Sequence, residues 1–224
     1  MTLALSEDLR FCRSGDRTIF MDIEKGRYFT ITNSDAEVFG RWHEGKAVDV
    51  GDAGQLAKLK SQGVLVDAKP HCSPQSSRRV DVEAPKESWS CKTRKTSLRN
   101  LALAFGLRLL WSWRVRHSPF KRLLELQHRL STKAALGARP FDRFRLDRII
   151  SAFEIADLLV GSHDRCLERS FALAAACRRQ SFDVTIVIGI QGQPFAAHCW
   201  VQLGPIVLNE KPDAVGMFSP ILVL

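Results

Sequence analysis

The chain has 224 residues, of which 45% are hydrophobic and 25% are charged. This composition is that of an ordinary globular protein and excludes a chain that is disordered throughout. No stretch approaches the roughly 18 uninterrupted apolar residues that a membrane span needs, and residues 1–8 lack the basic start and apolar core of a secretion signal. We therefore expect a cytoplasmic protein with reduced thiols and one or two domains.

The formal net charge of +9 comes from 33 Lys and Arg against 24 Asp and Glu, and it is unevenly distributed. Residues 91–148 carry 15 basic and 3 acidic side chains, so the whole excess lies in this segment. Such a segment fits a solvated helix surface, a face that docks a partner or attracts an acidic peptide, or a nucleic-acid surface. No base-reading module stands out, so we do not expect nucleic acid as a partner.

Motifs for metals and nucleotides are missing from the sequence. Six cysteines are scattered without a Cys-x2-Cys pair, which argues against a zinc or iron–sulfur site. Neither a phosphate-binding loop nor a Gly-x-Gly-x-x-Gly motif occurs. The sequence thus predicts no metal and no cofactor, and each cysteine must be judged against a role as a small buried residue.

The first part of the chain predicts a small α+β module. Three short β-rich runs at residues 9–13, 18–23 and 28–32 are separated by turn signals at 14–16 and 24–26. Short strands joined by tight turns favour a three-stranded antiparallel meander.

Two helices and a short closing run follow this meander. The first helix begins at Asn33 or Ser34, which are good N-caps, and ends at Gly45. The second covers about residues 53–62, and the run 64–66 closes the unit. Helices packed behind the meander give a winged-helix-like domain that leaves one edge of the sheet unpaired.

The domain boundary is predicted in a segment rich in Pro, Ser and mixed charge. Residues 68–95 lack apolar periodicity and have the composition of a linker. The predicted domains are therefore residues 1–67 and 96–224.

The second domain is predicted as helices followed by an antiparallel sheet. Residues 97–160 are helical in pattern, and a helix over about 165–179 precedes strand-like runs at 184–188, 196–201 and 206–208. Three apolar stripes define the helical part: Leu98, Leu101, Phe105 and Leu109; Phe120, Leu123, Leu124, Leu126 and Leu130; Ile149, Ile150, Phe153, Ile155, Ala156 and Leu159.

Cys166 is the strongest candidate nucleophile among the cysteines. It opens a predicted helix, where the macrodipole and unpaired N–H groups favour a thiolate and can form an oxyanion hole. Arg165 and Arg169 are expected to add positive charge nearby. Cys177 lies three turns further along among alanines, which predicts a core position.

A histidine and an acid follow in the order that a Cys–His–acid triad requires. His198 lies in a predicted strand, where alternation places Cys199 on the opposite face. The next strand ends at Glu210, with Asp213 just beyond, so an antiparallel neighbour can bring an acid beside His198. Without further information, structural roles for the cysteine and the histidine remain open.

Residues from about 95 to the end resemble the leader peptidase of lasso-peptide biosynthesis, the B protein or its B2 half. This family is a transglutaminase-like, papain-type cysteine peptidase. Residues 166–170 match its Cys-Leu-x-Arg-Ser motif, residues 198–201 correspond to the usual His-Ala-Trp-Val, and residues 208–210 correspond to Leu-Asn-Asp.

The resemblance implies that the leader of a ribosomally made precursor is removed by Cys166, His198 and an acid. An asparagine-synthetase-like cyclase would then close the macrolactam ring, and any use of ATP would come through that partner. Glu210 occupies the acid position in place of Asp, with Asp213 as the alternative. The rival interpretations are a transglutaminase-like acyl transferase with the same triad and a non-catalytic basic scaffold that binds leader or nucleic acid.

Residues 1–67 resemble the recognition element of peptide-modifying pathways, similar to the small chaperone of pyrroloquinoline quinone biosynthesis. The resemblance implies that the leader adds as a strand to the exposed edge at residues 28–32 and lies in a groove against a helix. Core packing of Leu56 and Leu59 is the alternative. The residues implied in leader binding are Tyr28, Phe29, Thr30, Ile31, Leu56, Leu59 and Lys60.

Overall fold

The computed structural model describes residues 3–47, 49–68, 82–91, 96–137, 140–161 and 165–224. The chain divides into two compact units, Met1–Asp81 and Val82–Leu224. Both combine helices and sheets, which confirms the predicted α+β class. No helix in the described part of the chain has the length and apolar character needed to cross a membrane.

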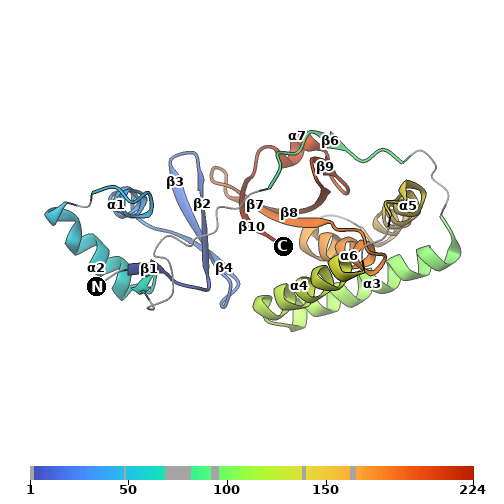
Figure 1. Cartoon of the computed structure of the whole chain (residues 1–224), viewed down its shortest axis with the longest axis horizontal. Helices are drawn as coiled ribbons and strands as arrows, with labels where there is room; N and C mark the ends of the chain where they lie inside the picture. The colour runs from blue at the N-terminus through green and yellow to red at the C-terminus, as the bar shows by residue number, and fades with distance from the viewer. Residues whose placement is uncertain (1–2, 48, 69–81, 92–95, 138–139, 162–164) are drawn as a thin grey trace. The chain divides into compact units, whose positions relative to one another are not determined.

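The first unit contains the predicted meander (Figure 1). Its antiparallel sheet has the order β2-β3-β4, and a separate antiparallel pair joins β1 to β5. Gly15 and Gly26 have positive φ in the two meander turns, a conformation that glycine adopts without steric cost. The elements are β1 (Leu3–Leu5), β2 (Leu9–Ser14), β3 (Arg17–Asp22), β4 (Arg27–Thr30), α1 (Asn33–His43), η1 (Val50–Asp52), α2 (Ala53–Ser61) and β5 (Leu65–Asp67).

Aromatic packing holds α1 against the meander. The Phe20 ring on β3 stacks on that of Phe29 at 5.2 Å and meets the ring of Phe39 on α1 edge-on at 5.1 Å. Leu59 of α2 is fully buried in the same core. In the sheet order, β4 is an edge strand, and no strand in the described part of the chain pairs with its outer side.

In its described residues, the second unit packs four long helices and one sheet. The sheet has the order β10-β7-β8-β9-β6, with antiparallel pairs except for the parallel pair β6–β9. The elements are β6 (Glu87–Ser88), α3 (Leu98–His117), α4 (Phe120–Leu136), α5 (Arg143–Val160), α6 (Cys166–Arg179), β7 (Thr185–Gln191), β8 (Ala196–Leu203), β9 (Ile206–Val207), α7 (Pro212–Val215) and β10 (Ser219–Val223).

The linker predicted over residues 68–95 ends earlier than expected, because the second unit begins at Val82. Glu87 and Ser88 form β6 at the edge of the second sheet, and the indole of Trp89 donates a hydrogen bond of 2.8 Å to Asp147 on α5. Residues 82–91 therefore belong to the second unit. Residues 69–81 and 92–95 lie outside the described part.

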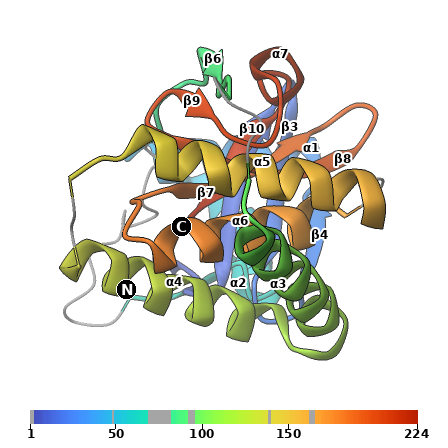
Figure 2. The same cartoon turned by 90° about the vertical axis from the view of Figure 1, so that its right-hand side faces the viewer.

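Helix α6 is the central element of the second unit (Figure 2). It contacts α3, α4 and α5 on one side and strand β8 on the other. Its residues from Ser170 to Arg178 are buried without interruption, which explains why the sequence carries a run of small residues there. A helix enclosed in this way gives its first residue a fixed position relative to the sheet.

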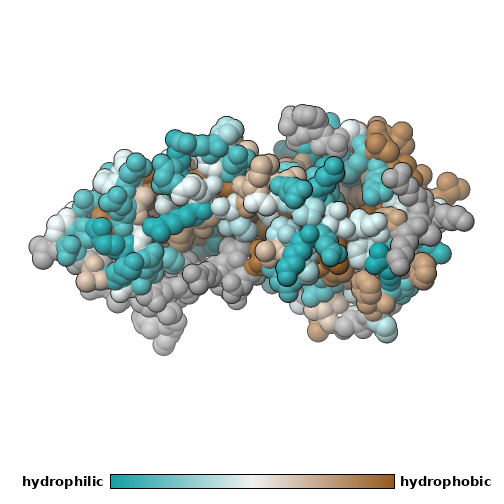
Figure 3. Space-filling view, turned by 90° about the horizontal axis from the view of Figure 1, so that it is seen from above, coloured by the Kyte–Doolittle hydropathy of each residue, from teal (hydrophilic) through white to brown (hydrophobic). Residues whose placement is uncertain are grey.

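The apolar stripe predicted for the first long helix is wrong, whereas the third stripe is largely buried. Leu98 and Leu109 of α3 are exposed, and the helix buries Leu107 and Trp111 instead. Figure 3 shows polar residues over much of the visible surface with hydrophobic residues exposed among them. Helix α3 carries apolar side chains on more than one face, so periodicity alone does not define its buried side.

Candidate active site and a groove in the first unit

Cys166 is the first residue of α6, as predicted, and its thiol is half-buried beside His198. Burial alone would raise the pKa of this thiol. The hydrogen bond from His198 and the charge of its imidazolium outweigh burial, aided by backbone hydrogen bonds from Cys199 and Leu167. The pKa of Cys166 is therefore lower than that of an ordinary thiol, which favours the thiolate.

His198 lies on β8, and its imidazole hydrogen-bonds Cys166 and faces Glu210. These two partners raise its pKa to about 9, even though burial acts in the opposite direction. A lowered thiol pKa and a raised imidazole pKa together favour a thiolate–imidazolium pair. The side chain of His198 is 22% exposed, so the pair is within reach of a bound molecule.

Glu210 occupies the acid position of the site. Its Oε1 lies 3.6 Å from Nε2 of His198, and the pKa of Glu210 is lowered by this contact with His198 and by Arg169. Asp213, the alternative acid, is exposed on α7. The geometry therefore brings Cys166, His198 and Glu210 together and leaves Asp213 outside this group.

Two polar side chains join α6 to the strand that carries His198. The hydroxyl of Ser170 donates to the backbone carbonyl of Cys199 at 2.8 Å and accepts from the Asn209 side chain at 3.0 Å. The Asn209 carbonyl oxygen accepts from the backbone N–H of Val201 at 2.9 Å. These bonds fix helix, strand and the Glu210 segment relative to one another.

The packing around His198 depends on a glycine in the neighbouring strand. Gly189 on β7 lies opposite His198, and a Cβ placed on it would approach Phe218 Cβ to 2.7 Å and Trp200 Cζ3 to 2.8 Å. Phe218 in turn packs against the imidazole, with ring centroids 5.3 Å apart. A glycine is therefore required for these two rings to support His198.

In none of the other described cysteines does a histidine lower the pKa of the thiol. Cys177 and Cys199 are completely buried, and burial raises the pKa of both thiols, to about 12 for Cys177. Burial also raises the pKa of Cys12 and Cys91. Cys72 lies outside the described residues. The core position predicted for Cys177 is confirmed.

The expected contribution of Arg169 to the thiol takes a different form. Its guanidinium donates to Asp157 at 2.8 Å and to Glu210 at 3.1 Å, so its charge is paired with two carboxylates. The groups that lower the pKa of Cys166 are His198 and two backbone N–H groups instead. Sequence reasoning missed Asp157, Ser170 and Asn209. Ser170 lies in the Cys-Leu-x-Arg-Ser motif, and Asn209 lies in the stretch that corresponds to Leu-Asn-Asp.

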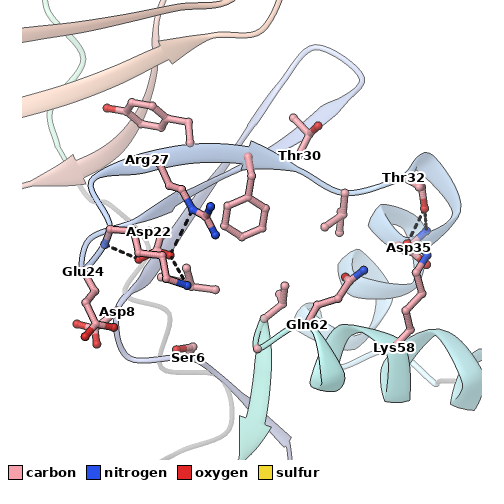
Figure 4. Close-up of a pocket in the computed structure, with 17 residues that line it drawn as sticks. Ser6, Asp8, Asp22, Glu24, Arg27, Thr30, Thr32, Asp35, Lys58 and Gln62 are labelled. Atoms are coloured by element: carbon pink, nitrogen blue, oxygen red, sulfur yellow. Dashed lines mark hydrogen bonds and ion pairs between the residues drawn. The ribbon is translucent and has the colours of Figure 1, made fainter.

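A groove of about 490 Å³ lies in the first unit between β4 and α2 (Figure 4). The four predicted edge residues, 28–31, all line it. Charged pairs mark its two ends: Lys25 Nζ lies 3.6 Å from Asp22 Oδ2, and Lys58 donates to Asp35 at 2.6 Å. The groove thus runs along the free edge of the sheet.

The residues that α2 contributes to this groove differ from those expected. Leu59 is fully buried in the core and Leu56 packs against that core, while Lys60 pairs with Asp67 on β5 at 2.6 Å. Lys58 and Gln62 line the groove instead, one helical turn apart. The prediction of Leu56, Leu59 and Lys60 as groove residues is therefore wrong, and core packing holds for both leucines.

The family model of the transglutaminase-like superfamily matches residues 102–223, which include all three residues of the triad geometry. The chain belongs to this superfamily.

The chain is also similar to the microcin J25-processing protein McjB of Escherichia coli, with 40% identity over 48 residues. This match covers 21% of the chain and spans 23% of McjB. It supports the resemblance to the B proteins of lasso-peptide biosynthesis. No solved structure matches the chain significantly.

Proposed function

We propose that this protein binds the leader of a lasso-peptide precursor and cleaves the leader from the core peptide by cysteine proteolysis. The observation that carries the proposal is the pairing of Cys166 with His198, whose pKa values are shifted toward the thiolate–imidazolium form. The similarity to a microcin-processing protein supports a precursor peptide as substrate.

The proposed chemistry follows from the position of each group. The Cys166 thiolate attacks the carbonyl carbon of the leader–core peptide bond, and N–H groups at the start of α6 stabilise the developing oxyanion. Protonated His198 gives its proton to the departing amine of the core peptide. Water, deprotonated by the now neutral imidazole, then releases the leader acid from the thioester.

Glu210 has an orienting role in this proposal. Because Nε2 of His198 faces Glu210, Nδ1 is the ring nitrogen left to face the thiol. The carboxylate stabilises the imidazolium and holds the ring in this orientation. The mechanism uses side chains and water, and we propose that any dependence on ATP arises through the cyclase that receives the core peptide.

Leader binding is proposed for the groove along β4. An extended peptide can pair its backbone with the free edge of this strand, because edge strands present unpaired N–H and C=O groups. Residues 28–31, Lys58 and Gln62 would contact its side chains. The charged pairs at the groove ends favour a peptide with polar positions there.

A transglutaminase-like acyl transfer is the second candidate, because an amine can replace water at the same thioester. The test is to incubate the full chain with a lasso-peptide precursor, with and without a primary amine, and to weigh the products. Hydrolysis predicts a free leader acid in both samples. A leader carrying the amine mass would favour acyl transfer, and an intact precursor would overturn the proposed cleavage.

A further inference from the structure

We propose that Arg169 is a positioning residue, which holds the Glu210 carboxylate against His198. The inference rests on the proposed function, because it assigns a role in the same site. Arg169 lies one turn into α6 from Cys166, so one helix would place both the nucleophile and the group that orients its base.

The guanidinium of Arg169 bridges two carboxylates. Its Nε donates to Asp157 Oδ2 at 2.8 Å, and its Nη1 donates to Glu210 Oε1 at 3.1 Å. This Oε1 is also the atom that lies 3.6 Å from His198 Nε2. A planar guanidinium with donors in a fixed fork can set the position of that oxygen, which a single ammonium cannot do in the same way.

The position of Arg169 is itself fixed, because its partner Asp157 pairs with a buried arginine. Asp157 on α5 forms an ion pair of 3.0 Å, through Oδ1, with Nε of Arg108 on α3. The Arg108 side chain is only 1% exposed, and its Nη2 donates to the backbone carbonyl of Gly161 at 3.2 Å. Alternating charges thus run from the interior of the helical layer to Glu210, with anchors on three helices.

Glu210 needs such an anchor because of where it lies. It is in the segment between β9 and α7, outside any helix or strand, and its side chain is 22% exposed. Holding a long, rotamer-rich side chain in one conformation costs conformational entropy. The hydrogen bond from Arg169 offsets part of this cost and keeps Oε1 on the imidazole side.

A competing role makes the opposite prediction. If Arg169 only drew Glu210 away from His198, its removal would strengthen the Glu210–imidazolium contact and lower the pKa of the Cys166 thiol further. If Arg169 positions Glu210, its removal weakens that contact and raises the thiol pKa. The sign of the change therefore separates the two roles.

The test compares full-length R169Q with the parent chain by the pH dependence of Cys166 alkylation. Iodoacetamide is the probe, and the modified Cys166 peptide is quantified by mass spectrometry, so no precursor is needed. We expect the midpoint to move up by about one pH unit. A midpoint that is unchanged or moves down would overturn the proposal.

Cleavage of the precursor provides the second readout. A misplacement of about 1 Å costs a catalytic group on the order of 100-fold in rate, so kcat should fall by about this factor while KM stays the same. If the parent chain cleaves no precursor, the proposed function fails, but the alkylation midpoint still decides the role of Arg169.

Three further variants complete the experiment. R179Q removes the same charge at the exposed far end of α6 and should leave both readouts unchanged. In an E210Q background, R169Q should cause no additional loss, and additive losses would contradict action through Glu210. Should R169Q fail to fold, R169K gives the same comparison, because its ammonium lacks the fork that reaches both carboxylates.

Discussion

Cys166 and Cys177 lie on the same helix, yet their surroundings shift the pKa values of their thiols in opposite directions. Cys177 is enclosed by apolar residues, and burial disfavours its thiolate. Cys166 at the helix start meets an imidazolium and backbone N–H groups, which more than compensate for its burial. The chemistry of this site is therefore set by the position of a side chain on α6.

The pH profile of cleavage follows from these shifts. The lowered pKa of Cys166 provides thiolate below the pH at which an ordinary thiol ionises, so the acid limb lies below that pH. His198 loses its proton as the pH rises through about 9, and with it the acid for the leaving amine. We expect kcat/KM to fall on both sides of this window. The two apparent pKa values of the profile describe the coupled Cys166–His198 pair and not either residue alone.

The alkaline limb also tests Glu210. Glu210 raises the pKa of His198, so E210Q should move this limb to lower pH. D213N, which changes the exposed acid on α7, is the matched control and should leave the limb in place. The same shift in both variants, or in neither, would contradict the assignment of Glu210 as the acid.

At the scale of elements, the edge of β4 and the end of α2 define the groove of the first unit. Replacing Gln62 by Trp would fill the groove with a bulky ring and change no residue of the second unit. We expect Q62W to weaken binding of a fluorescent leader peptide by about tenfold or more, roughly 1.4 kcal/mol, as measured by anisotropy. A57W places the same ring on an exposed part of α2 that does not line the groove, and should bind as the parent does. Equal binding by both variants would exclude this groove.

Strands β7 and β8 support the site through Gly189. A methyl group there would displace Phe218 and Trp200, and overpacking of a core typically costs about 1–3 kcal/mol. G189A should therefore lower the free energy of unfolding by this amount in urea titrations and reduce cleavage. G106A adds a methyl group on α3 that meets no atom within 4 Å and should stabilise the helix by about 0.5–1 kcal/mol. A fully stable, fully active G189A would contradict the packing role.

Local patterns predicted most elements, because tight turns and apolar periods are encoded by neighbouring residues. The meander and the helix that begins at Cys166 are examples. The orientation of a helix is set by tertiary packing, and this explains why Leu109 is exposed and why Lys58 lines the groove in place of Leu56.

In the candidate site, too, local sequence predicted some features, and tertiary packing set the others. Cys166, His198 and Glu210 follow in one order along the chain, and the pairing of β8 with β9 brings Glu210 beside His198 as expected. The Arg169–Asp157 contact joins α6 to α5, and nothing in the spacing of these residues selects one carboxylate among many. Arg108 likewise lies in the basic segment yet is buried and paired, which charge counting does not reveal.

For the whole molecule, we propose leader binding by the first unit and cleavage by the second. These two activities should separate in a single chain that lacks only the thiol. For the basic segment 91–148, a solvated helix surface and a docking face both stay predictions, and its exposed Arg and Lys residues are not needed by the proposed chemistry.

The most direct measurement uses full-length C166A with the fluorescent precursor, following anisotropy for binding and mass spectrometry for cleavage. We expect unchanged leader affinity and a loss of cleavage of about 10³-fold or more. C91A, which removes a half-buried thiol of raised pKa, should bind and cleave as the parent does. Cleavage by C166A at the parent rate would contradict the central claim that Cys166 is the nucleophile.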